Sequence, residues 1–281
     1  MTLSTSNHDR DSAGLTYVYP VLSRRAGGVS IGINLNVNHA CNWRCIYCQV
    51  PDLTRGGPPP VDLALLEDEL RRMLDDILHG DFMARAVPEA MRRLNDIALS
   101  GNGEPTSSAE FPAVIELIGR LLDEFGQRGR IKVVLISNGS LMHREPVQAG
   151  LHRLADLGGE VWFKLDRASS EGLRAVNQTE TTPDKVLHNL ERCAHACPTW
   201  IQTCVFSLDG QAPAEDEIKA YLKLLRRALA NGAPLRGVLL YGLARPSTQP
   251  EAPRLGRLPE AWLAALAGQI GQLGLATRLF P

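Results

Sequence analysis

IKVVLIS, residues 131–137, is apolar on both of the faces that alternate side chains of a β-strand would occupy. A strand of this kind is typical of a parallel sheet that is covered on both sides, because none of its faces needs to meet water. Apolar residues recur at helical spacing on both sides of this strand, over 110–125 and 144–157. The two predicted helices can cover such a sheet. The centre of the chain therefore predicts a parallel α/β fold.

The same alternation continues in both directions along the chain. Strands are predicted at 31–38, 96–100, 131–137, 160–166, 199–208 and 236–244, with a short final one near 275–280. Helices are predicted at 62–79, with Asp62 as its cap, and at 110–125, 144–157, 183–195, 214–230 and 259–272. Six strand–helix units in succession imply parallel strands joined by right-handed crossovers. An open doubly wound sheet and a curved, barrel-like sheet both fit this pattern.

The overall composition indicates a globular protein. The 281 residues are 44% hydrophobic and 22% charged, and the formal net charge is −1. This balance provides no overall attraction to nucleic acid or to an anionic membrane. The polar start and the lack of a long apolar run predict a cytoplasmic protein without a secretory signal or a membrane span. We divide the chain into an N-terminal extension, 1–30, and an α/β domain, 31–281.

Chemically suggestive motifs gather near the carboxyl ends of the predicted strands, which is where parallel α/β folds place their sites. These motifs are HACNWRCIYCQ (39–49), GNGEPT (101–106), SNG (137–139), KLD (164–166), QTC (202–204) and LARPS (243–247). Because the carboxyl ends of parallel strands meet at one edge, we expect the motifs to form a single site.

The first motif holds Cys41, Cys45 and Cys48 in the spacing C-x3-C-x2-C. In a reducing compartment, clustered cysteines indicate metal ligands or catalysts rather than disulfides. Structural zinc normally takes four protein ligands as two separated pairs, and no second pair complements this loop. A 4Fe–4S cluster held by only three cysteines leaves one iron open to an exchangeable ligand. A non-catalytic zinc or iron–sulfur scaffold is the alternative from another class.

C-x3-C-x2-C after the first strand, with Tyr47 inside the motif and Gly-Glu-Pro after the second strand, resembles the radical S-adenosylmethionine superfamily. The resemblance extends from about residue 30 to the end of the chain. It implies a partial (β/α)6 TIM-like barrel of parallel strands, a 4Fe–4S cluster and S-adenosylmethionine. In that family the cofactor chelates the open iron, and electron transfer yields methionine and a 5′-deoxyadenosyl radical that abstracts a substrate hydrogen. The cofactor performs the chemistry, and the protein orients and shields it.

The resemblance also assigns roles to individual residues. It makes Cys41, Cys45 and Cys48 the cluster ligands, and it places Tyr47 near the adenine. The methionyl amine would be bound by Gly101, Asn102, Gly103, Glu104 and Pro105, where Asn102 interrupts the usual paired glycines. Contacts to the ribose and carboxylate are expected from Ser137, Asn138, Lys164 and Asp166. Position alone adds Gln202, Tyr241 and Arg245, of which only Gln202 is taken into the predicted cofactor site.

INLNVNHACNWRCIYCQ, VWFKLD and YGLARPS resemble the branch of iron–sulfur oxidoreductases that includes the tRNA wyosine-base enzymes. Those relatives carry a second cluster on cysteines that precede the main motif, whereas the first 40 residues here contain none. A shorter relative with a different substrate is therefore expected. Three later cysteines, Cys193, Cys197 and Cys204, are candidate ligands of an auxiliary cluster. Their positions in a predicted helix and strand favour buried thiols instead.

These observations predict a single-cluster radical enzyme that acts on a small molecule or on a peptide or protein side chain. An RNA-modifying enzyme of the wyosine-synthase type is the second hypothesis. The expected partners are the substrate and an electron donor such as flavodoxin or ferredoxin. Neither nucleic acid nor a membrane is expected as a partner.

Overall fold

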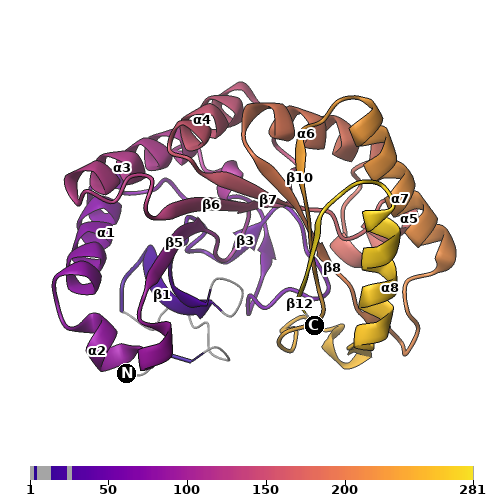
Figure 1. The fold of residues 1–281 in the computed structure, drawn as a ribbon, viewed down its shortest axis with the longest axis horizontal. Coiled ribbons are helices and arrows are strands. Elements are labelled where there is room, and N and C mark those ends of the chain that lie inside the picture. The colour runs from indigo at the N-terminus through magenta and orange to yellow at the C-terminus, as the bar shows by residue number, and fades with distance from the viewer. Residues whose placement is uncertain (1–2, 5–13, 24–26, 281) are drawn as a thin grey trace.

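The computed structural model describes residues 3–4, 14–23 and 27–280. Its centre is an eight-stranded sheet in the order β1-β2-β5-β6-β7-β8-β10-β12, which ends in two edge strands. The sheet is curved, and the long helices lie along its outer side, as Figure 1 shows. All neighbouring strands are parallel except β1 and β2, which are antiparallel. The predicted α/β class is confirmed, and the curvature selects the partial barrel over the open doubly wound sheet.

The strands of the main sheet alternate with six long helices. The strands are β1 (Val18–Ser23), β2 (Gly28–Ile33), β5 (Leu94–Leu99), β6 (Lys132–Ser137), β7 (Glu160–Lys164), β8 (Thr199–Cys204), β10 (Leu235–Tyr241) and β12 (Thr277–Phe280). The helices are α1 (Leu63–Leu78), α3 (Phe111–Glu124), α4 (Glu145–Asp156), α6 (Pro183–Ala196), α7 (Glu215–Ala230) and α8 (Glu260–Gly271). Each predicted helix is found within one or two residues of its expected ends.

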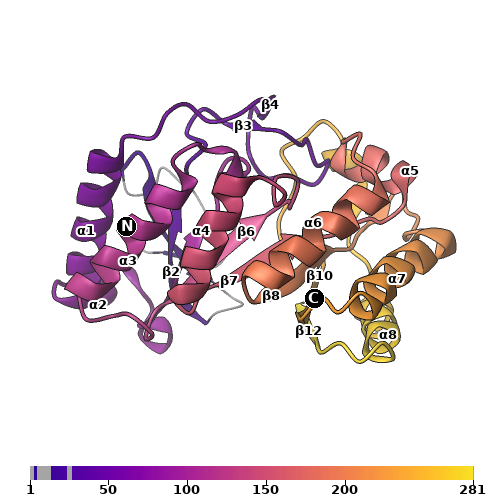
Figure 2. The same cartoon turned by 90° about the horizontal axis from the view of Figure 1, so that it is seen from above.

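Short elements occupy the connections. They are β3 (Ala40–Cys41), β4 (Thr54–Arg55), α2 (Phe82–Ala86), α5 (Ser170–Gly172), β9 (Ser207–Leu208) and β11 (Leu255–Gly256). β3 and β4 pair in the cysteine loop, which runs along one rim of the barrel, at the top of Figure 2. β9 pairs with β11 and so joins the segment after β8 to the segment after β10.

β1 is the strand of the main sheet that sequence patterns did not predict. It lies within the proposed N-terminal extension and contains Pro20, which has no N–H to donate to a neighbouring strand. The position is tolerated because β1 is an edge strand that pairs only with β2. The predicted strand at 31–38 begins earlier, at Gly28, and ends at Ile33. Residues 34–38 instead lead the chain from the sheet to the cysteines.

Alternation of side chains divides each central strand between two environments. Ile31, Ile97, Val133, Val161 and Ile201 are fully buried in the core that the helices cover. Their neighbours along the strands face the interior of the barrel and include charged, polar and aromatic groups. The apolar core thus lies between sheet and helices, and the inner face of the sheet is left for a ligand site.

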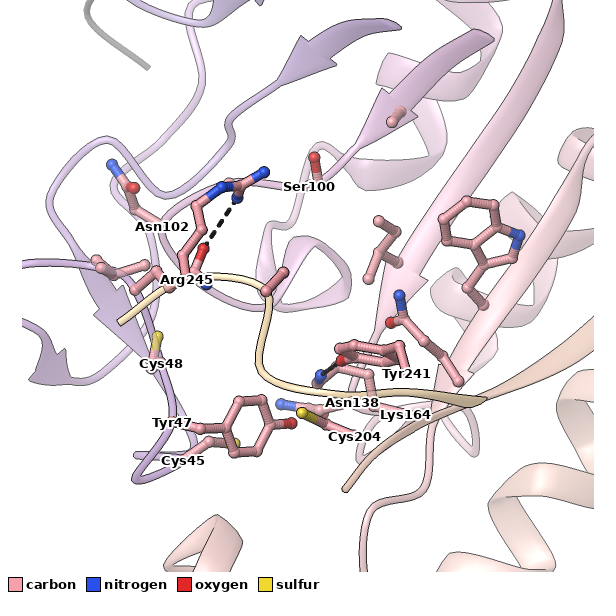
Figure 3. A pocket seen from close by; sticks show the side chains of 18 of the residues that line it. Cys45, Tyr47, Cys48, Ser100, Asn102, Asn138, Lys164, Cys204, Tyr241 and Arg245 are labelled. Atoms are coloured by element: carbon pink, nitrogen blue, oxygen red, sulfur yellow. Dashed lines mark hydrogen bonds between the residues drawn. The ribbon is translucent and has the colours of Figure 1, made fainter. Parts of the chain in front are cut away.

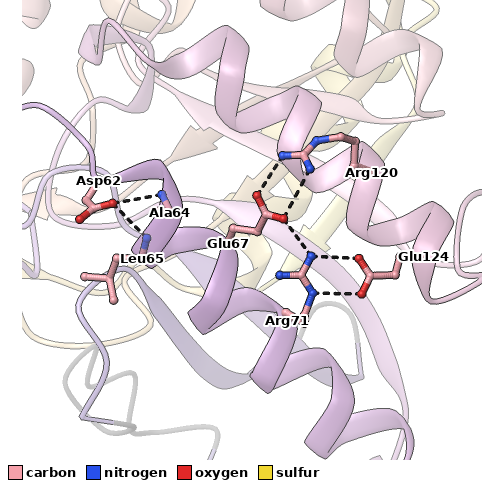
Figure 4. A network of polar contacts seen from close by, with 7 residues as sticks. All are labelled: Asp62, Ala64, Leu65, Glu67, Arg71, Arg120 and Glu124. Carbon is pink, nitrogen blue, oxygen red and sulfur yellow. Dashed lines mark hydrogen bonds and ion pairs between the residues drawn. The ribbon is translucent and has the colours of Figure 1, made fainter.

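Helix α1 is fixed to the rest of the fold by two kinds of polar contact. Asp62 caps it as predicted, with Oδ1 accepting hydrogen bonds of 3.0 Å from the N–H groups of Ala64 and Leu65. Ion pairs on the surface join α1 to α3 through Glu67, Arg71, Arg120 and Glu124 (Figure 4). Exposed pairs of this kind contribute little free energy of folding.

The buried carboxylate of Glu69 makes the stronger connection. It is 4% exposed and accepts hydrogen bonds from the backbone N–H groups of Thr16, Tyr17 and Val18, at 2.7, 2.8 and 3.2 Å. This carboxylate therefore holds the start of β1 against α1.

Within the described ranges, no helix is both long enough and apolar enough to cross a bilayer.

Replacement of Glu69 by alanine is expected to lower the free energy of unfolding by about 3 kcal/mol, because three backbone donors lose their acceptor. Urea denaturation of the purified protein measures the change. Glu116→Ala is the matched control, since Glu116 forms only an exposed 3.7 Å ion pair with Arg153. Equal losses in the two variants would contradict the assigned role of Glu69.

Candidate active site

A cavity of about 960 Å³ opens at the carboxyl ends of the strands and continues into the barrel (Figure 3). Three loops form part of its wall: the cysteine loop (39–49), the loop after β5 that we call the glycine loop (101–106), and the segment after β10. Residues of all eight strands of the main sheet also line it. The cavity therefore collects most of the motifs that the sequence placed at strand ends.

Most of the predicted site residues share the wall of this cavity. Those that line it are Cys41, Cys45, Tyr47, Cys48, Gly101, Asn102, Gly103, Glu104, Asn138, Lys164 and Gln202, together with Tyr241 and Arg245. Pro105, Ser137 and Asp166 are buried and lie outside the set that lines it. Ser137 and Asp166 instead contact residues of the wall from behind.

The three predicted cluster ligands lie close enough to influence one another. Burial raises the pKa of the Cys41 and Cys45 thiols to about 12, and a negative charge on Cys48 adds to this effect. Both groups are therefore protonated thiols at neutral pH unless a cation stabilises their thiolates. The Asn177 side-chain N–H lies 3.3 Å from the sulfur of Cys45 and donates to it. Hydrogen bonds to cysteine sulfur are one of the features that set the reduction potential of iron–sulfur centres.

The chemistry of these thiols bears on the group that they could hold. Among the described residues, no three His, Cys, Asp or Glu side chains are arranged to hold a single metal ion. All three thiols line the same cavity, and cysteine thiolates are the ligands that hold iron–sulfur clusters. The donor set thus fits an iron–sulfur cluster.

A segment from the far end of the chain holds the cysteine loop in place. Ser247 Oγ donates to the carbonyl groups of Ile46 and Cys48, at 2.8 and 2.9 Å. Gln249 Nε2 donates to the carbonyl of Val50 at 2.8 Å. We call residues 247–249 the strap. Since the strap satisfies carbonyl groups on both sides of Cys48, it fixes the path of the ligand loop.

An ion pair reinforces this attachment. Arg44, inside the cysteine motif, pairs with Glu251, just beyond the strap. Arg44 also donates to Gln178 at 2.8 Å, and Gln178 follows the segment that carries Asn177. The cysteine loop is thereby tied to two distant parts of the chain.

The Glu104 carboxylate accepts hydrogen bonds from neighbouring protein groups. The side chain is 2% exposed, and its Oε1 accepts from Thr106 N–H, Thr106 Oγ1 and Ser137 Oγ at 3.1, 2.6 and 2.7 Å. Its Oε2 accepts from the Asn138 N–H at 2.7 Å. Burial raises the pKa of this carboxyl group, and the four hydrogen bonds oppose the rise. Glu104 therefore joins the loop after β5 to the loop after β6, and its predicted contact with the cofactor amine stays a prediction.

The glycine at 103 is explained by a close approach of two loops. A Cβ atom there would lie 2.2 Å from the Ala40 carbonyl oxygen and 2.5 Å from Asn36 Nδ2. Both contacts are far too short for any side chain. Gly103 thus allows the loop after β5 to pack directly against the residue that precedes Cys41.

The partly buried Lys164 and the buried Tyr47 and Asp166 form one group. Lys164 Nζ donates to Tyr241 Oη at 3.2 Å and lies 4.9 Å from the centre of the Tyr47 ring (Figure 3). Burial lowers the pKa of Lys164, but the charge of Asp166 and the neighbouring Tyr241 raise it overall. Tyr47 donates its hydroxyl to Asp166, which also accepts from Asn177 Nδ2 and the Cys204 N–H, each at 2.9 Å. Asp166 thus orients the groups around the cavity from behind its wall.

The predicted burial of the remaining cysteines is confirmed. Cys193 and Cys197 lie in the core, where Cys193 Sγ is 3.4 Å from Thr199 Oγ1. Cys204 is also buried, yet it lines the cavity, because the end of β8 turns it towards the interior of the barrel.

Several residues of the site were not found from the sequence. Asn177 ends a short π-helical turn that was not predicted, and the strap lies in a loop of which only Ser247 belongs to a sequence motif. Asp96 and Trp162 line the cavity from within β5 and β7. Asp96 could have been found, because a carboxylate inside an otherwise apolar strand marks an inward-facing polar position.

A curved parallel sheet with a cysteine-lined cavity at its carboxyl edge defines a partial α/β barrel with its site at the strand ends. Residues 35–225 match the model of the radical SAM superfamily, and the chain belongs to that family. The superfamily in general implies S-adenosylmethionine and a 4Fe–4S cluster. The crystal structure of a radical SAM methyltransferase from Sphaerobacter thermophilus covers 94% of this chain, with a TM-score of 0.60 and 15% identity. That structure, of which the match covers 68%, supports the fold alone.

Two curated relatives match parts of the chain. GTPase Obg of Brachyspira hyodysenteriae is 25% identical over 215 residues, which are 74% of this chain and 28% of the relative. GTP 3′,8-cyclase of Mannheimia succiniciproducens is 33% identical over 115 residues, which are 40% of this chain and 27% of the relative. The chain thus spans less than a third of either relative.

Glu104→Ala is expected to lower the free energy of unfolding of the metal-free protein by about 3 kcal/mol, because four buried donors lose their acceptor. Urea denaturation measures this change. The control is Glu110→Ala, since Glu110 Oε2 accepts only from Ser108 Oγ, at 2.8 Å. Unchanged stability combined with weakened S-adenosylmethionine binding would show instead that the carboxylate serves the cofactor amine.

Proposed function

We propose that the protein uses a 4Fe–4S cluster bound by Cys41, Cys45 and Cys48 to cleave S-adenosylmethionine reductively. The bound cofactors would supply methionine and a 5′-deoxyadenosyl radical, which abstracts a hydrogen atom from a substrate in the same cavity. The observation that carries this proposal is the shared cavity, whose wall includes all three thiols and the glycine loop. The family of the chain supports the same chemistry.

The size and walls of the cavity favour a substrate that enters the barrel. Single-ligand pockets commonly measure about 300–1,000 Å³, and this cavity measures about 960 Å³. Such a volume has room for the cofactor and for a small molecule or one side chain of a peptide or protein. Lys164 and Asn138 lie where they can hold polar groups of the cofactor, while the inner face of the sheet is left for the substrate.

An electron must reach the cluster from outside the chain. We propose flavodoxin or ferredoxin as the donor and the reducing cytoplasm as the compartment, since both suit a low-potential iron–sulfur centre with thiolate ligands.

The test is release of 5′-deoxyadenosine by anaerobically reconstituted protein under a chemical reductant. Iron content should approach four per chain in the parent, and Cys45→Ala should lose both the cluster and at least 100-fold of the release. The loss follows because two thiolates cannot retain the cluster in competition with solvent.

Cys193→Ala provides the matched control, because Cys193 is a buried thiol of the core that does not line the cavity. This control should keep iron and release close to the parent values. Stoichiometric zinc in place of iron, or release from Cys45→Ala at the parent rate, would overturn the proposal.

A further inference from the structure

The floor of the cavity carries a carboxylate that the cofactor chemistry does not use. Asp96 lies on the inner face of β5 and pairs in register with Ser30 of β2, whose hydroxyl donates to Asp96 Oδ1. Both side chains line the cavity. Asp96 precedes Gly101 of the glycine loop by five residues, which is about 16 Å along an extended strand. The two residues therefore mark opposite ends of the same cavity.

Among the described residues, no cationic side chain forms an ion pair with Asp96 within 4.0 Å. Lys132 of β6 and Glu160 of β7 influence it from the neighbouring strands, but they pair with each other at 3.0 Å. Burial raises the pKa of Asp96, which is 8% exposed, and the hydrogen bond from Ser30 opposes the rise.

A second buried acceptor faces the same cavity. Gln202 of β8 is 3% exposed, and its Oε1 has no hydrogen-bond partner among the described residues. Buried carbonyl oxygens of this kind are rare, because the loss of hydration is not compensated. The inner face of the barrel thus presents acceptors from two strands to a ligand that brings donors.

The walls between the floor and the rim have a different character. Val21, Val134, Ile136 and Trp162 contribute apolar and aromatic surface to the cavity. Such surface suits an aliphatic arm, and an aromatic ring can also stabilise a nearby cation. An anionic floor beneath apolar walls matches a positive group at the end of an alkyl chain.

We propose that Asp96 and Ser30 form a substrate subsite that binds the protonated amine of an alkylammonium group. The aliphatic arm of this group lies along the walls, so that its carbon atoms lie between the floor and the cofactor end of the cavity. The inference rests on the proposed function, and it narrows the substrate to an amine-bearing small molecule or side chain.

Two probes of similar shape, one cationic and one neutral, test the subsite on the reconstituted protein with S-adenosylmethionine and without reductant. The probes are n-butylamine, protonated at pH 7.5, and 1-butanol, and ligand-observed NMR titration measures their affinities. The parent should bind the ammonium about tenfold more tightly than the alcohol, as expected for a charge-assisted hydrogen bond. Equal affinities for the two probes would overturn the proposal.

Three substitutions then assign the preference to one residue. Asp96→Asn should bind the two probes with similar affinity, whereas Asp96→Glu should keep a preference for the ammonium. Asp123→Asn, which removes an exposed carboxylate paired with Arg128, should retain the full parent preference. If Asp96→Asn still prefers the ammonium as strongly as the parent does, the proposal is overturned. If Asp96→Asn binds neither probe, Asp96→Glu decides: loss of its preference for the ammonium would overturn the proposal.

The outcome is separable from that of the proposed function. Failure of the radical chemistry would appear as absence of 5′-deoxyadenosine from the parent under reductant. Failure of the subsite would appear in probe binding, which requires no turnover.

Discussion

Alternate residues of a β-strand must point to opposite faces of the sheet, and in this protein the two faces have opposite chemistry. Helices bury the outer face, which is built from residues such as Ile97 and Val133. The inner face carries Asp96, Lys164 and Gln202, which a close-packed core would not accept without partners. A shift of one residue in any strand would exchange its outward apolar residues with its inward polar ones. The register of the sheet therefore determines both the stability of the fold and the polarity of the cavity.

The rim of the barrel is held together by buried polar contacts between loops. Glu104 joins the loops after β5 and β6, while the strap and Arg44 join the cysteine loop to the segment after β10. Gly103 permits the glycine loop to touch the cysteine loop directly. Because each contact connects segments far apart in the sequence, the three cysteines are placed by the whole barrel and not by their own loop alone.

The cavity has two ends with different electrostatics. Near the cysteines, Lys164 provides a partly buried cation between Tyr47 and Tyr241, which suits the anionic part of an amino-acid cofactor. At the floor, Asp96 provides a carboxylate below apolar walls. This polarity offers a physical reason for two ligands to enter one cavity in a fixed order and orientation. It also makes the proposed substrate class follow from the fold rather than from any single relative.

Much of the fold and the set of candidate cluster ligands could be predicted, because both depend on residue patterns that are local in the sequence. The period of apolar residues predicts each long helix and central strand, and C-x3-C-x2-C places three thiols within eight residues. β1 escaped prediction because Pro20 interrupts its pattern, and its position depends on pairing with β2 and on the hydrogen bonds to Glu69 of α1.

Side-chain roles at the rim depend on contacts over long distances in the chain, which no local pattern contains. Glu104 and Asp166 were predicted to contact the cofactor, and the tertiary structure adds that each accepts hydrogen bonds from protein donors. Asn177, the strap and Asp96 likewise gain their positions only when distant strands and loops meet. The sequence by itself determined the class of fold and predicted the cysteine ligands, because those depend on spacing along the chain. The tertiary structure decided which polar groups face the cavity and which support it, because that depends on where the curved sheet brings their partners.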